Sequence, residues 1–121
     1  MNYPCGKGQT SKLYIAVHED VEDFMVPALV AHAVLGKHLS IVNKTTTKLH
    51  DLEYFEWLDS SFKKVVVRVN QKEFDKIASL YNVYSAYEKT QMQGKTSCLV
   101  WLYSEGYLPN VLKFAKLWRP K

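Results

Sequence analysis

The stretch Leu13–Gly36, LYIAVHEDVEDFMVPALVAHAVLG, decides how this chain is expected to fold. It opens with a largely apolar run, Leu13–Val17, whose composition is typical of a strand. An acidic turn at residues 18–23 follows and leads into a segment with Pro27 near its start and Gly36 at its end. Proline suits the first turn of a helix, and glycine suits the position just past the last helical residue. The stretch therefore predicts a strand, a turn and a helix that ends at Gly36.

The expected helix has no polar face. Between residues 25 and 35, His32 is the one polar residue. A helix that is apolar all round is normally buried against a sheet or a partner, and a strand that feeds such a helix is typical of α/β folds. Ligands in those folds bind beyond the carboxyl ends of the strands. The acidic turn at residues 18–23 is therefore the expected rim of a functional site.

Length and composition indicate an ordinary soluble protein. The chain has 121 residues, of which 47% are hydrophobic and 23% are charged, and one domain of this size buries a sizeable core. The net charge of +4 slightly favours anionic partners. Its two cysteines are too few for a disulfide framework and lack metal-ligand spacing. No apolar stretch approaches the roughly 18 residues of a membrane span, so we expect a cytoplasmic protein without membrane attachment.

Strands and helices are expected to alternate along the rest of the chain. Residues 1–12 read as a flexible tail, and residues 13–121 read as a single domain. The valine-rich run Phe62–Asn70 suits a central strand, and Gln71–Leu80 has apolar residues at helical spacing. The other expected elements are a basic connection at Lys37–His50, a short helix at Asp51–Trp57, strands at Asn82–Tyr87 and Ser97–Tyr103, and a final helix at Leu108–Trp118.

This order of elements favours parallel pairing with right-handed crossovers. The strands at Leu13–His18 and Lys63–Val69 should be parallel neighbours. We therefore predict an α/β fold: a three-layer sandwich in which a four-stranded mixed sheet carries helices on both faces.

Three segments resemble the type II peptidyl-tRNA hydrolases of archaea and eukaryotes. They are Lys12–Gly36, Trp57–Leu80 and Lys89–Gln91, in that order and spacing. The matching features are an aspartate at the end of the first strand, a His-Ala pair on the helix, a Lys-Lys-Val-Val-type strand that ends in Val-Asn, and a loop similar to Gly-Arg-Thr-Gln. The resemblance covers most of the chain, and it implies the family's α/β fold and hydrolysis of the ester between peptide and tRNA.

The chain departs from this family at the expected cleft. The family's Gly/Lys-rich turn corresponds to Val21–Val26, VEDFMV, which is acidic and contains no lysine. The family's helix glutamine corresponds to Leu29, and its Asp and Gly before the Arg-Thr turn correspond to Ala86 and Glu88. A rim of carboxylates repels a phosphate backbone instead of neutralising it.

The resemblance implies a site built from two segments, with the ligand between the turn at Asp20–Met25 and the loop at Lys89–Thr96. The candidate catalytic residues are Asp20, His32 and Thr90, which would position water and the ester carbonyl. The candidate ligand-binding residues are Glu19, Lys89, Thr90, Gln91 and Lys95.

Several of these residues also have ordinary structural interpretations. Asp20 suits a turn or a helix cap, and His32 suits a core histidine that bonds a neighbouring loop. The acidic turn contains metal-ligand residue types without the spacing of a known site. We therefore expect neither a metal nor a cofactor.

Three functions stay open at this point. The first is an active peptidyl-tRNA hydrolase, the second is a binding protein on the same fold that has lost catalysis, and the third is a protein-interaction domain with a vestigial cleft. The missing lysine favours the second over the first, and the retained Asp20 and Thr90-Gln91 favour it over the third. Its expected partners are tRNA, other RNA or a nucleotide-like small molecule, and a homodimer is left open.

Overall fold

The computed structural model describes residues 11–44, 46, 48–103 and 108–121. The tail expected at residues 1–12 therefore lies outside the described residues, apart from its last two. Five strands form one mixed sheet in the order β3-β4-β1-β2-β5. They are β1 (Lys12–His18), β2 (Lys63–Val69), β3 (Tyr84–Tyr87), β4 (Thr96–Tyr103) and β5 (Lys116–Leu117). The α/β class and the mixed sheet are as predicted, but there are five strands and not four.

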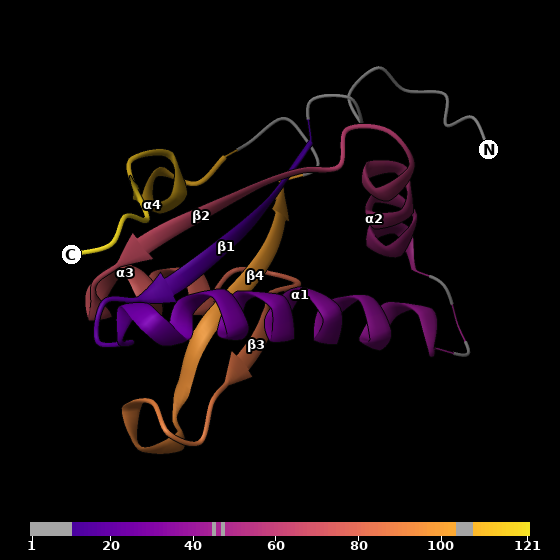
Figure 1. The fold of residues 1–121 in the computed structure, drawn as a ribbon. Coiled ribbons are helices and arrows are strands. Elements are labelled where there is room, and N and C mark those ends of the chain that lie inside the picture. The colour runs from indigo at the N-terminus through magenta and orange to yellow at the C-terminus, as the bar shows by residue number, and fades with distance from the viewer. Residues whose placement is uncertain (1–10, 45, 47, 104–107) are drawn as a thin grey trace.

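The centre of the sheet is the predicted parallel pair. β1 and β2 run in the same direction, with Ile15 opposite Val66 and His18 opposite Val69 (Figure 1). β4 pairs antiparallel with the other side of β1 and with β3 at the edge. The carboxyl ends of β1 and β2 therefore meet at the same edge of the sheet, beside the turn that follows His18.

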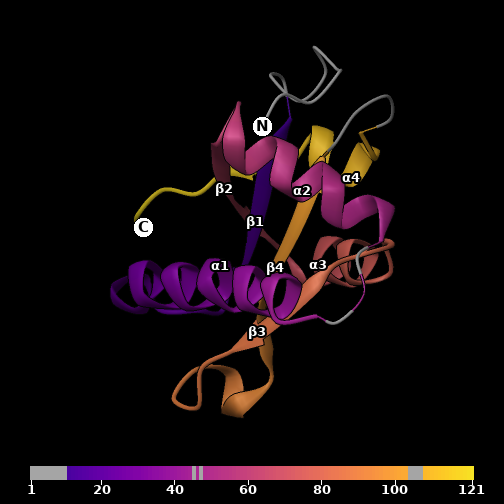
Figure 2. The same cartoon turned by 90° about the vertical axis from the view of Figure 1, so that its right-hand side faces the viewer.

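The helices are α1 (Val26–Val42), α2 (Leu49–Asp59), α3 (Gln71–Ala78) and α4 (Asn110–Lys113), with short 3-10 helices η2 (Asp23–Met25) and η3 (Met92–Gly94). α1 crosses β1, β3 and β4, whereas α3 packs against β1, β2, β4 and α4. Figure 2 shows α1 and α3 on opposite sides of β4. Pro27 lies in the first turn of α1, as its position in the sequence predicts.

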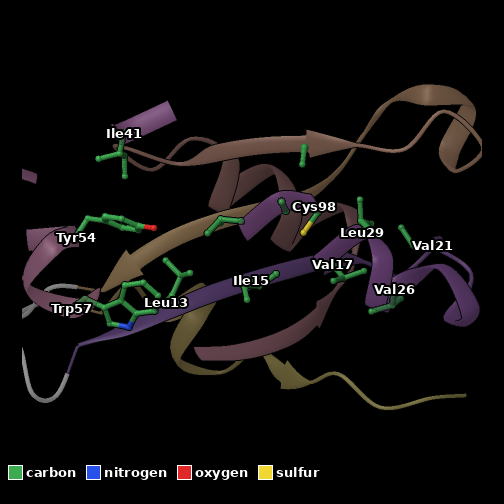
Figure 3. Packing of buried hydrophobic residues seen from close by; sticks show 13 residues of the cluster. Leu13, Ile15, Val17, Val21, Val26, Leu29, Ile41, Tyr54, Trp57 and Cys98 are labelled. Carbon is green, nitrogen blue, oxygen red and sulfur yellow. The ribbon is translucent and has the colours of Figure 1, made fainter. Parts of the chain in front are cut away.

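Two apolar clusters form the core, because successive side chains of a strand point to opposite faces. Leu13, Ile15 and Val17 of β1 belong to the cluster that contains residues of α1 and α2. Ala16 belongs to the second cluster, with Phe74 of α3 and residues of β2 and α4. In Figure 3, Tyr54 and Trp57 of α2 lie at one end of the first cluster, and Val26 and Leu29 of α1 lie at the other.

The expected final helix at Leu108–Trp118 is wrong. Asn110–Lys113 is helical, but Lys116–Leu117 forms β5 against Val67 and Arg68 of β2. The backbone N–H of Trp118 also donates to the carbonyl of Val66 at 2.9 Å. β2 has an edge that needs backbone partners, so pairing with it prevails over the helical spacing of the apolar residues.

The expected end of α1 at Gly36 is also wrong, because the helix continues to Val42. Gly36 faces β3, where an added Cβ would overlap the hydroxyl and ring of Tyr84. The glycine is therefore needed for close approach of helix and strand and not for a helix end. Much of the connection expected at Lys37–His50 is accordingly helical.

The expectation that α1 is buried all round is wrong as well. The buried row of α1 consists of Val26, Leu29, Ala33, Lys37 and Ile41. On the opposite side Leu35 is 59% exposed and Leu39 is 46% exposed. A helix that lies on a sheet contacts it along one face, and no other described element covers the far face of α1.

The expectation that no stretch approaches a membrane span needs correction too. In the described part of the chain, Asp23–Val42 forms one helical segment of 20 residues with a mean hydropathy of 1.5, of which 28% is buried. Length and composition would let such a segment cross a bilayer. A core helix of a soluble protein has the same properties, so this is weak evidence for a membrane span.

Candidate functional site

The acidic turn and the loop after β3 are joined by a hydrogen bond. The backbone N–H of Glu22 donates to Oε1 of Gln91 at 2.9 Å, and the Gln91 side chain is buried at 3% exposure. Gln91 also closes its own loop, since its N–H donates to the carbonyl of Glu88 and its carbonyl accepts from Gly94. The two segments named in the sequence analysis therefore lie side by side. Gln91, however, is an anchor of the loop, and its Oε1 is already used by the protein.

The loop has an unusual backbone that fixes its shape. Met92, Gln93 and Gly94 have consecutive positive φ values of 50°, 57° and 77°. A non-glycine residue in this region costs about 1–2 kcal/mol, so other contacts must hold the loop. Met92 supplies one by packing against the α1–α2 core cluster, and the Gln91 bond supplies another.

Thr90 holds the carboxylate of Glu88. The Thr90 hydroxyl donates to Oε1 of Glu88 at 3.0 Å, and the Thr90 backbone N–H donates to the same oxygen at 2.9 Å. These two hydrogen bonds, together with the charges of His32 and Lys89, hold the pKa of Glu88 below its ordinary value. The loop therefore presents an ionised carboxylate, with His32 of α1 close enough to act on it.

His32 lies on the open face of α1 and is exposed. The interpretation of His32 as a core histidine is therefore wrong. Much of α1 faces solvent, including the position of His32. His32 is instead available to a ligand that lies against Glu88 and Thr90.

Asp20 and Glu19 stand apart from this group. Both are exposed, and the Asp20 side chain has 71% of its surface open. The Asp20 backbone N–H donates to Nδ1 of buried His18 at 3.0 Å, and Nε2 of His18 bonds Oε1 of Gln71 at 2.8 Å. Because Nδ1 accepts, the imidazole proton belongs on Nε2. No hydrogen bond or ion pair of the described residues joins Asp20 to His32 or Thr90.

The turn is partly neutralised by the segment after β5. Oδ1 of Asp23 accepts from Nη2 of Arg68 at 2.9 Å, and Oδ2 accepts from the backbone N–H of Lys121 at 2.6 Å. The Lys121 and Arg68 hydrogen bonds hold the pKa of Asp23 below its ordinary value. Nζ of Lys121 donates to the carbonyl of Glu19 at 3.1 Å, and Nη2 of Arg68 donates to the carbonyl of Arg119. The cations that face the turn therefore come from β2 and the C-terminal segment.

Two hollows flank this turn. One of about 490 Å³ lies between the end of β2 and β5, and its polar lining includes Glu19, Arg68 and Arg119. The other, also about 490 Å³, is a shallow depression over residues 19–24 and Lys121. Lys89 and Lys95 are both exposed on the loop side of the turn.

The described residues contain no group of three or more His, Cys, Asp or Glu side chains placed to hold a metal ion. The thiol of Cys98 is buried, which raises its pKa to about 12, so it is not a nucleophile at neutral pH.

No protein-family model and no curated protein matches this sequence. The resemblance to the type II peptidyl-tRNA hydrolases therefore depends on the three sequence segments alone.

Sequence reasoning missed three contributors to this region: Arg68, Glu88 and the C-terminal segment. Arg68 carries a signal, since it is the one charged residue among the valines of β2. Glu88 was noted as a departure from the family and was not considered as a partner of Thr90. The C-terminal segment was assigned to a helix, which hid its contact with the turn.

Proposed function

We propose that this chain is a divergent protein of the type II peptidyl-tRNA hydrolase-like superfamily, with its three-layer sandwich. It binds RNA or a nucleotide-like ligand between the turn at Asp20–Met25 and the loop at Lys89–Thr96, and its catalysis is weakened or lost. It acts in the cytoplasm, and a homodimer is part of the same proposal.

The bond between Glu22 and Gln91 is the observation that carries this proposal. It brings together the two segments that correspond in position to the family's cleft, although they are far apart in the sequence. The order of elements also agrees with the resemblance, because a strand with a following helix, a valine-rich strand, an amphipathic helix and a loop before β4 occur in the family's sequence order.

The cations of the loop support an anionic ligand. Lys89 and Lys95 are exposed on either side of Thr90 and Gln91. Lysines that neutralise the phosphates of a nucleic acid release its condensed counterions, which favours binding. Arg68 and Lys121 reduce the negative charge of the turn itself, which lowers the repulsion of a phosphate.

The arrangement of the candidate catalytic residues supports weakened or lost catalysis. Catalytic groups act only within hydrogen-bond reach of the reacting atoms. The Thr90 hydroxyl is directed at Glu88, and Asp20 makes no described contact with Thr90 or His32. The turn offers carboxylates where the family offers a lysine.

A protein-interaction domain with a vestigial cleft is the second candidate function. The observation in its favour is the open apolar face of α1, where Leu35 is 59% exposed and Leu39 is 46% exposed. Such faces mark contact surfaces in many proteins. The experiment below separates it from the first candidate.

Native mass spectrometry of freshly purified protein, followed by a peptidyl-tRNA hydrolysis assay, tests the proposal. We expect a co-purifying nucleotide or RNA, and turnover far below that of an authentic hydrolase assayed beside it. Full turnover that Asp20→Ala abolishes would identify an active hydrolase. A protein that has neither a co-purifying ligand nor turnover, and whose two-chain assembly is dissociated by Leu35→Glu, would favour the second candidate, whereas a dimer that carries a nucleotide or RNA agrees with the first.

A further inference from the structure

A small cavity lies far from the turn, between the second half of α1, the start of α2 and the end of β4. Its volume is about 180 Å³, and its lining includes Lys37, Ile41, His50, Tyr54, Tyr81 and Trp101. Ile41 and Tyr54 are close together at one end of the core cluster in Figure 3. An engineered cavity of about 150 Å³ in another protein holds one benzene molecule. The cavity therefore has room for one ring.

The cavity contains a buried cation with no partner. Lys37 is 6% exposed, and no hydrogen bond or ion pair of its Nζ is found within the described residues. Burial, reinforced by the charge of Lys44 and partly offset by that of Asp51, lowers the pKa of Lys37 from 10.5 to about 8. Unpaired charges are rarely buried, so an anion bound in the cavity would reduce the cost of burying Lys37.

The charge of Asp51 acts on Lys37, but the oxygens of Asp51 already accept other hydrogen bonds. It accepts from Nζ of Lys44 at 3.1 Å and from the backbone N–H of Lys48 at 3.0 Å, and Nε2 of His50 lies 3.3 Å from Oδ1. Burial raises the pKa of Asp51, but these hydrogen bonds and charges outweigh it and keep the pKa below its ordinary value. Asp51 therefore stays ionised, and its hydrogen bonds go to Lys44 and the segment before α2 and not to Lys37.

The aromatic side chains that line the cavity indicate what kind of ligand fits beside Lys37. Tyr54 is fixed by a hydrogen bond of 2.7 Å between its hydroxyl and Nδ1 of His38, so it offers its ring to the cavity. Trp101 donates its indole N–H to the carbonyl of Tyr81 at 3.0 Å and likewise offers its ring. The Tyr81 ring lies against the His50 ring, with centroids 5.9 Å apart. Flat apolar walls of this kind suit an aromatic ring.

Glu53 decides between a carboxylate and a phosphate. Its side chain also lines the cavity, and a second negative charge on the ligand would face this carboxylate. A monoanion can pair with Lys37 and meets less of that repulsion than a dianion does. We propose that the cavity is a binding site for a one-ring aromatic carboxylate, with its acid group on Nζ of Lys37 and its ring between Tyr54, Tyr81 and Trp101.

Calorimetric titrations of the whole chain with benzoate, nicotinate and inorganic phosphate test this proposal. We expect benzoate or nicotinate to bind and phosphate to bind at least tenfold more weakly. Lys37→Met should lower the affinity for benzoate at least tenfold. Lys48→Met, which removes a nearby exposed lysine, should change that affinity less than twofold. Binding at pH 8 should also take up about half a proton, because the carboxylate restores the charge of Lys37.

A second variant keeps the proposal testable if Lys37→Met does not fold. Tyr81 is 67% exposed, so Tyr81→Ala should fold and should weaken benzoate severalfold. The proposal is overturned if neither carboxylate binds, if phosphate binds as tightly as benzoate, or if Tyr81→Ala binds benzoate like the unaltered chain. It is also overturned if Lys37→Met folds and binds benzoate as tightly as the unaltered chain.

Discussion

The backbone N–H of Glu22 is held by Oε1 of Gln91 at a distance of 2.9 Å, in a position where the glutamine side chain is 3% exposed. This bond connects the turn after β1 with the loop after β3 across 69 residues of sequence. Because Glu22 precedes η2 and α1, the bond also fixes where the helix begins relative to Thr90 and the lysines of the loop. The proposed site therefore depends on a residue that itself does not face the ligand.

Replacement of Gln91 by methionine should lower the free energy of unfolding by about 0.5–1.5 kcal/mol, because it removes the acceptor of the Glu22 N–H. Gln93→Met is the matched control, since Gln93 is exposed in the same loop. Urea denaturation of both variants provides the comparison. Equal losses for the two would mean that the Gln91 bond contributes nothing.

The two faces of α1 should respond differently to truncation. Leu29 is 2% exposed in the α1–α2 core cluster, so Leu29→Ala should cost about 2–5 kcal/mol. Leu35 is 59% exposed, and Leu35→Ala should change the unfolding free energy by no more than about 0.5 kcal/mol. Thermal and urea unfolding measure both. A large loss for Leu35→Ala would reveal that a partner covers this face in solution.

Gly36→Ala should destabilise the protein although alanine favours a helix by about 1 kcal/mol over glycine. The added Cβ overlaps the Tyr84 hydroxyl, and overpacking typically costs about 1–3 kcal/mol. The same change in a Tyr84→Ala background should be stabilising, because the obstacle is gone. A double-mutant cycle by urea denaturation measures the coupling; a change of the same size in both backgrounds would refute the overlap.

Lys37 should make stability rise with pH. Its pKa is about 8 in the folded chain and 10.5 when unfolded. Between these values the unfolded state binds more protons, so the free energy of unfolding increases as pH rises from about 8 to 10.5. The full change is on the order of 3 kcal/mol.

This test compares the free energy of unfolding of the unaltered chain with that of Lys37→Met between pH 7 and 10. The difference isolates Lys37 from Cys98, Tyr14 and Tyr54, whose pKa values burial raises. We expect Lys37→Met to be the more stable protein at pH 7 and the two to converge toward pH 10. Parallel curves would show that the buried lysine keeps its ordinary pKa.

Local patterns were sufficient to predict the centre of the fold. The apolar run of β1 and the valines of β2 specify buried strands by themselves, and the pairing of β1 with β2 follows from the intervening helices. Gln71–Ala78 begins with the capping box of Asn70 and Glu73, which exchange side-chain to backbone hydrogen bonds. These elements depend on neighbours in sequence, so a single sequence contains their signals.

The features that sequence reasoning missed depend on residues that are distant in the chain. The role of Gly36 depends on Tyr84 of β3 lying against it, and β5 depends on the free edge of β2. The burial of Lys37 depends on α2 and β4, because a lysine on a helix is ordinarily read as solvated. For the candidate site, the parallel strand ends and the family resemblance of the loop predicted the adjacency of turn and loop, whereas the anchoring role of Gln91 and the partnership of Glu88 with Thr90 had no signal in the sequence.

Ligand binding between the turn and the loop is tested most directly by fluorescence-anisotropy titration of labelled tRNA, with AMP as a competitor. The unaltered chain is compared with two double variants that each lose two lysines. Lys89→Ala/Lys95→Ala removes the two exposed cations of the loop, and Lys76→Ala/Lys113→Ala removes two exposed cations of α3 and α4. We predict that the loop variant binds about 10- to 100-fold more weakly and loses about two units of the salt dependence, while the control variant stays within twofold of the unaltered chain. Equal losses for the two variants, or a greater loss for the control, would contradict a site at the loop.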